Sequence, residues 1–185
     1  MPYATLAMLA DAPGARELAE IATPEHEPVC DADKLDHLLR GGDWDTADVT
    51  QARAWHRAED AIRTIAAAQQ AADAIIDGYL AKKGYRLPLD PCPPLVGQWA
   101  RSIVRYLLHK DRRTLEDGDP ICRNYRDALK LLQQTADGHF ALSGSDGVQI
   151  HQTDAQLGRG DAVQMVCARP DPSRTFGRAQ MRFFR

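Results

Sequence analysis

The sequence predicts a mainly α fold: a small helical bundle of about four to five helices, with a long N-terminal loop insertion and an extended C-terminal arm holding a candidate short β-hairpin. Three observations predict it. Apolar residues recur at helical spacing over residues 49–83, and the segment 93–109 is apolar around most of its circumference. The pair Asp119-Pro120 marks a further helix start, an N-capping carboxylate before a proline whose missing N–H costs nothing there. We place the helical domain at residues 1–142 and the arm at 143–185.

The N-terminal helices are predicted to be short. Thr5 is a suitable hydroxyl cap for a helix over residues 6–10, and Pro13-Gly14 ends it. Residues 15–22 have the apolar spacing of a second helix.

Residues 23–49 lose this periodicity and are rich in proline, glycine and aspartate. We interpret them as a long surface loop inserted into the helical domain, with one turn of helix at 34–40. Loops of this length are uncommon unless they have a function or are loosely ordered.

The longest helix is expected over residues 49–83. Its alanine-rich middle has high helix propensity. Lys82-Lys83 followed by Gly84 predict its end, because cations favour the last turn and glycine tolerates positive φ. The expected buried stripe consists of Trp55, Ile62, Ile65, Ala72, Ile75, Ile76, Tyr79 and Leu80.

The helix over residues 93–109 should be the central, buried one, with Trp99 and Tyr106 in the core. Its polar residues form a single narrow stripe: Gln98, Arg101, Ser102, Arg105 and His109. Arg101 and Arg105 are four residues apart and project the same way, so they either face solvent or form ion pairs between subunits.

After the helix that begins at Asp119-Pro120 and ends at Gly138, the pattern changes. Residues 148–150 and 163–165 alternate as short strands would, which suggests the hairpin.

Residues 169–185 combine five arginines with one aspartate, in a chain whose formal net charge is −3. They also hold three phenylalanines, whereas disordered tails are poor in aromatic residues. Arginine and aromatic residues are enriched at interface hot spots, so we interpret the segment as a docking arm. The residues expected to bind a partner are Arg174, Phe176, Arg178, Arg182, Phe183 and Phe184.

The composition argues against several classes of protein. The four cysteines lie far apart without a CxxC pair, which is typical of a reducing compartment and not of a disulfide framework. The negative net charge of the chain gives no support for a free-standing DNA-binding domain, which usually carries a basic face. We find no signal peptide and no run near the roughly 18 apolar residues of a membrane span. We therefore expect a soluble protein, made in the cytoplasm, with no membrane partner.

The sequence contains no phosphate loop, metalloprotease, hydrolase or kinase motif, so we expect no enzyme activity and no cofactor. The best metal candidate is the loop cluster of His26, Cys30 and His37 with two neighbouring aspartates. Pro28 disfavours the helix that would align the first two, which makes metal binding the weaker interpretation.

Several segments carry a resemblance to a known family. They are Tyr3-Ala4-Thr5, AADAIIDGYLAKKGYRLPL (Ala71 to Leu89), PPL (Pro93 to Leu95), ARSIVRYLLHKDR (Ala100 to Arg112) and YRDALKLLQQTADGHFAL (Tyr125 to Leu142). Together they resemble the small Mu-type phage and prophage proteins placed among head–tail connector, or adaptor, proteins. The resemblance covers about residues 3–22 and 60–142, and the acidic loop looks longer than the family pattern.

The resemblance implies a structural virion protein in the neck of a tailed bacteriophage, assembled in the bacterial host cytoplasm. Members are taken to form a ring beneath the portal that matches its twelve-fold symmetry. The implied partners are other copies of the chain, the portal protein and the next neck or tail protein, a stopper or tail terminator. Genome DNA would pass through the lumen without sequence-specific binding.

The alternative is a small phage-encoded DNA-binding or regulatory protein that uses the basic arm to contact phosphates. An enzyme with a metal site in the loop comes third.

Overall fold

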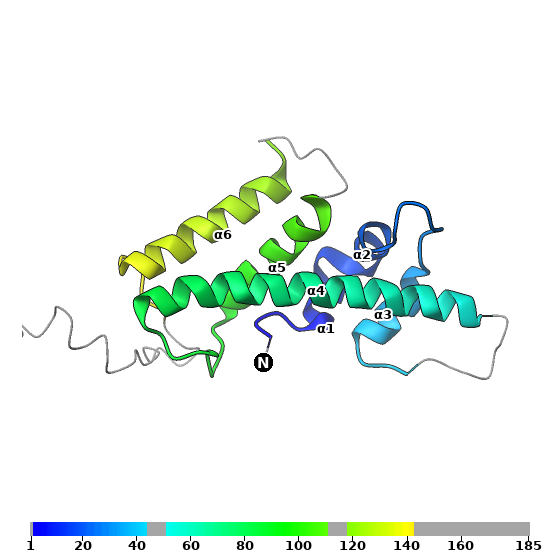
Figure 1. Ribbon diagram of the computed structural model, residues 1–185, viewed down its shortest axis with the longest axis horizontal. Coiled ribbons are helices and arrows are strands. Elements are labelled where there is room, and N and C mark those ends of the chain that lie inside the picture. Colours follow the sequence, from blue (N-terminus) through cyan, green and yellow to red (C-terminus); the bar gives the residue numbers. More distant parts are fainter. Residues whose placement is uncertain (1, 44–50, 111–117, 143–185) are drawn as a thin grey trace, which may run out of the picture.

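The computed structural model describes the chain over three stretches: residues 2–43, 51–110 and 118–142. Within them the chain is mainly helical, which confirms the predicted fold class. The longest helix, α4 (Ala52–Lys83), forms the spine on which the other helices pack (Figure 1). The candidate hairpin and the rest of the arm lie outside the described residues.

α5 (Pro94–Lys110) and α6 (Pro120–Asp137) pack on α4 and on each other. The chain turns back after α4, so α5 runs antiparallel to it and α6 returns parallel to it (Figure 1). An ion pair of 2.9 Å from Lys82 Nζ to Asp137 Oδ1 joins the C-terminal ends of α4 and α6.

The predicted stripe of α4 is confirmed except at Trp55. Ile65, Ala72, Ile76 and Leu80 are fully buried, and Ile62, Ile75 and Tyr79 pack against the same core. Trp55 is only half-buried and lies against His37 and Lys34, outside that core. The helix ends at Gly84, whose φ of 87° is the left-handed conformation that glycine adopts without a steric cost. This positive φ turns the chain towards α5.

α5 is the central helix, as predicted. Val96, Ala100, Ile103 and Val104 are fully buried, and Trp99 is 4% exposed beside Phe140, with ring centroids 6.3 Å apart. Tyr106, also expected in the core, is instead half-buried outside it, where it stacks face to face on Tyr125 of α6 with ring centroids 3.8 Å apart. His109 departs from the expected polar stripe, because it is buried.

The two capped helix starts are those that the sequence predicts. The Thr5 hydroxyl accepts a hydrogen bond from Met8 N and caps α1 (Leu6–Leu9). The Asp119 carboxylate accepts one from Ile121 N and caps α6. A π-helical segment, η1 (Ala10–Gly14), kinks at Ala12, whose backbone is extended, and ends the first helix; α2 (Ala15–Ala22) follows it.

The N-terminal segment lies across one face of α4. Gln69 donates to the backbone oxygen of Ala4, Asp73 accepts from Tyr3 N at 3.2 Å, and Asp77 accepts from the Tyr3 hydroxyl. These three residues of α4 are spaced four apart and so share one side of the helix. Burial, and then the Asp77 carboxylate, raise the pKa of Tyr3 well above its ordinary value, so the phenol stays protonated as a donor.

The long loop predicted over residues 23–49 is wrong in part. Residues 32–39 form a helix of two turns, α3 (Ala32–Leu39), instead of the single turn expected at 34–40. Asp31 caps it, and Leu35 and Leu39 enter the core against α4 and α2. The segment lacks long-range apolar periodicity because a helix this short needs only two buried positions.

None of the helices within the described stretches is long and apolar enough to cross a membrane.

Candidate functional site

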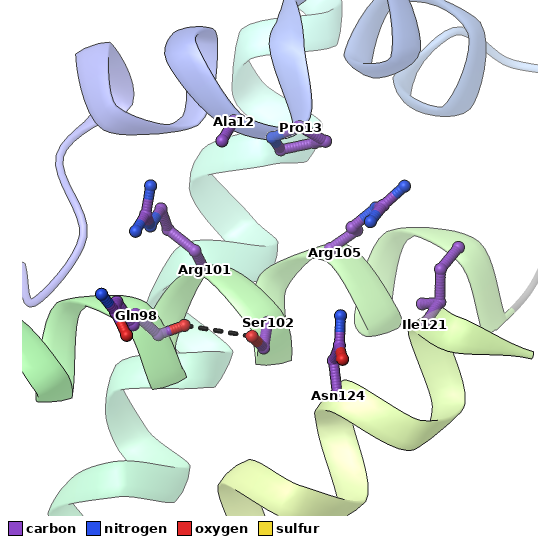
Figure 2. A pocket seen from close by; sticks show the side chains of 8 residues that line it. All are labelled: Ala12, Pro13, Gln98, Arg101, Ser102, Arg105, Ile121 and Asn124. Atoms are coloured by element: carbon purple, nitrogen blue, oxygen red, sulfur yellow. Dashed lines mark hydrogen bonds between the residues drawn. The ribbon is translucent and has the colours of Figure 1, made fainter.

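The polar stripe of α5 lines a groove between the N-terminal turn, α5 and the start of α6. One end of the groove is a cavity of about 280 Å³. Figure 2 shows the side chains of Arg101 and Arg105 extending from the side of α5 that faces Ala12 and Pro13. The cavity walls are formed by Ala12, Pro13, Gln98, Arg101, Ser102, Arg105, Ile121 and Asn124.

The far end of the groove is a second cavity, which shares Pro13, Arg105 and Ile121 with the first. Its wall contains an ionic cluster made by Glu17 of α2 with two residues of α5. Arg105 approaches the carboxylate with two nitrogens, Nε to Oε1 at 2.6 Å and Nη2 to Oε2 at 2.8 Å. His109 Nε2 lies 2.8 Å from Oε1. The interaction is bidentate: two parallel hydrogen bonds join the guanidinium to the carboxylate. Such pairs are stronger and more specific in geometry than a single charged hydrogen bond.

This cluster is partly shielded from water. The side chains of Glu17 and Arg105 are 27% and 33% exposed, and that of His109 is 4% exposed. Burial raises the pKa of Glu17, but hydrogen bonds and charges from Arg105 and His109 outweigh it, so the pKa lies below its ordinary value. The carboxylate is therefore ionised and ties α2 to α5.

The second nitrogen of His109, Nδ1, is buried and has no hydrogen-bond partner among the described residues. Nε2 points at a carboxylate, which only accepts, so Nε2 carries a proton. In the neutral ring Nδ1 is then an acceptor without a donor, an unfavourable state that a buried polar atom rarely keeps.

Arg101 and Arg105 thus differ, although the sequence treats them alike. Arg105 is held by Glu17 within its own chain. Arg101 is half-buried at the cavity wall, and no carboxylate in the described stretches forms an ion pair with it. A guanidinium that has lost part of its water without gaining an anion favours an incoming acceptor.

The other predicted site residues fall into two groups. The six arm residues lie outside the described residues: Arg174, Phe176, Arg178, Arg182, Phe183 and Phe184. In the metal candidate, Cys30 is buried and its Sγ lies 3.9 Å from the Ala19 carbonyl oxygen, whereas His26 is exposed. His37 meets the ring of Trp55 edge-on. Across residues 2–43, 51–110 and 118–142, no group of three or more His, Cys, Asp or Glu side chains is arranged to hold a metal ion.

Sequence reasoning missed Glu17, although it is central to the site. The residue lies on the polar side of a short amphipathic helix, 88 positions before Arg105. Nothing local in the sequence distinguishes it from Glu20, which is exposed. The polar stripe of α5 was the available signal, because charges on a helix that is otherwise buried require a partner nearby.

Comparison with known proteins identifies the family. The model for the family described as Bacteriophage Mu, Gp36 matches residues 3–158, most of the chain. The chain belongs to this family. The match begins at the N-terminal segment that crosses α4, and it includes η1, α2, α5 and α6, which line the groove.

A curated relative of the Gp36 family is the Mu-like prophage FluMu protein gp36 of Haemophilus influenzae (strain ATCC 51907 / DSM 11121 / KW20 / Rd). It is 35% identical over 71 residues, which is 38% of this chain and 47% of the relative. The match thus spans about half the length of that relative. No solved structure matches the chain. The protein is a Mu-type phage protein.

Proposed function

We propose that this Gp36-family protein is a head–tail adaptor, a structural and non-enzymatic component of the virion neck. Copies of the chain would form a ring beneath the portal, twelve-fold like the portal itself. The ring would contact the portal on one side and a stopper or tail terminator on the other, with genome DNA passing through its lumen.

The observation that carries the proposal is where the connector-like segments fall in the fold. The segment Ala71–Leu89 forms the end of α4, most of Ala100–Arg112 lies on α5, and Tyr125–Leu142 contains most of α6. These segments thus belong to one packed unit of three helices. The resemblance to connector proteins therefore falls on the body of the fold and not on one isolated helix.

The surface of that unit is consistent with assembly. Its groove carries a half-buried cation, Arg101, that has no acidic partner in the described part of the chain. A neighbouring subunit could supply an acceptor for this cation, and a contact that repeats from copy to copy closes into a ring when the rotation between copies closes.

Removing the gene from the phage tests the role. We expect DNA-filled heads and free tails to accumulate without joining, and expression of the protein from a plasmid to restore joined particles. Electron micrographs of lysates give the ratio of joined to separate particles. Normal particles in the absence of the gene would rule the adaptor role out.

A DNA-binding regulator is the second candidate, because residues 169–185 carry five arginines and one aspartate. It predicts binding to short duplex DNA that weakens steeply with added salt. The adaptor proposal predicts no specific duplex binding. Titration of fluorescent duplex at low salt separates the two.

A further inference from the structure

The loop between α2 and α3, residues 24–29, presents an exposed carboxylate and an exposed apolar side chain to solvent. It projects from the body of the molecule between the two helices (Figure 1). Glu27 is exposed, and its carboxylate has no ion-pair partner in the described part of the chain. Val29 is 56% exposed, the large apolar side chain most open to solvent among the described residues.

The loop is held in one shape before it meets any partner. Pro24 and Pro28 fix φ at two of its positions. The Thr23 hydroxyl is buried, donates to the Ala19 carbonyl at 2.6 Å and accepts from Cys30 N at 3.1 Å, which clamps both ends. A preformed loop loses little conformational entropy when it docks.

The cavity is complementary to this loop in charge and in the mixture of polar and apolar groups. Arg101 supplies a half-buried cation, and Ser102 and Asn124 add polar groups beside it (Figure 2). Pro13 and Ile121 form apolar walls. The cavity has a volume of about 280 Å³ and is open to solvent, so side chains can enter it from outside.

We infer that the cavity at Arg101 receives the residue 24–29 loop of a second copy of this chain, with Glu27 of that copy paired to Arg101 and Val29 against Ile121. Within one chain the loop does not reach Arg101, since Glu25 lines only the far end of the groove and no ion pair joins Glu27 to Arg101. Each copy carries one loop and one cavity, so the contact can repeat from copy to copy.

This inference deepens the adaptor proposal by naming the contact between copies, and it rests on that proposal. It is tested separately, by exchanging the two charges. Arg101→Glu and Glu27→Arg should each weaken self-association of the full chain by about tenfold or more, because each places like charges together. The double variant should restore association to within about threefold of wild type, since the pair is re-formed with the charges reversed.

Analytical ultracentrifugation at low salt measures the three variants against wild type, and circular dichroism checks that each is folded. Arg86→Glu and Asp127→Arg change exposed charges elsewhere and should leave association unchanged. The inference is overturned if Arg101→Glu associates like wild type, if the double variant is not restored, or if wild type stays monomeric at every concentration. None of these results bears on whether loss of the gene separates heads from tails, so the two proposals fail independently.

Discussion

At the scale of single residues, the carboxylate of Glu17 is the most consequential side chain of the groove. It is the anion for Arg105 and the partner of the buried His109. Loss of an anion from such a site leaves a cation and a ring nitrogen without a partner in a shielded environment, which costs more than the contact itself contributes.

Glu17→Gln should therefore destabilise the protein by about 2 kcal/mol, the typical cost of removing one charge from a partly buried hydrogen-bonded pair. Urea unfolding monitored by circular dichroism measures the change. Glu25→Gln is the matched control: it removes an exposed carboxylate from the same groove and should change stability by less than about 0.5 kcal/mol. Equal effects of the two substitutions would contradict the role assigned to Glu17.

The same carboxylate predicts a pH dependence. Its pKa in the folded protein lies below the ordinary value of 4.5, so the unfolded chain takes up its proton first as pH falls. The contribution of Glu17 to stability is complete above that ordinary value and is lost as pH falls through the lowered pKa. The stability difference between wild type and Glu17→Gln, followed by urea unfolding from pH 6 to pH 3, should shrink with acid. A difference that stays constant over this range would show that the ionised carboxylate is not the source.

At the scale of helices, two glycines at the end of α4 have opposite roles. Gly84 ends the helix at φ 87°, whereas Gly78 lies inside it with open space where a Cβ would stand. Alanine loses less conformational entropy than glycine on entering a helix, but it is strained at positive φ.

Gly78→Ala should stabilise the protein by about 0.5–1 kcal/mol, and Gly84→Ala should destabilise it by about 1 kcal/mol. The two substitutions are chemically identical and six residues apart, so they control for each other. Chemical denaturation of both variants gives the signs. Two shifts in the same direction would mean that the end of α4 is not where the structure places it.

The helices themselves were largely predictable because local signals agree with the fold. Apolar spacing identified the buried faces of α4 and α5, and the caps at Thr5 and Asp119 identified two helix starts. α3 was only partly predicted, since two buried leucines in eight residues make no recognisable period. Only the α5 wall of the groove could be predicted. The polar stripe on α5 is visible in the sequence, whereas the contact of Arg105 with Glu17 depends on how α2 packs against α5.

At the scale of the whole molecule, the chain divides into a helical body and a basic, aromatic C-terminal segment. Residues 169–185 carry five arginines in a chain whose net charge is −3, so the remainder is more acidic than the total. For an adaptor, an acidic body would let DNA slide through the lumen by repulsion, and the arginines and phenylalanines would anchor the ring to its neighbours.

Removal of residues 169–185 should leave a folded helical protein that no longer joins the portal, because the described bundle ends at residue 142. Circular dichroism reports the fold, and co-sedimentation with portal-containing heads reports joining. A triple variant, Phe176→Ala, Phe183→Ala and Phe184→Ala, keeps every arginine and should also fail to join if aromatic docking is required. Normal attachment of the truncated protein to heads would contradict the role of the arm.

Electron microscopy of purified virions, with image reconstruction of the neck, tests the central claim most directly. The adaptor account predicts a ring of this chain directly beneath the portal, with α4, α5 and α6 recognisable in each copy. Density in the neck that these helices cannot fit, or virions that lack the chain altogether, would contradict it.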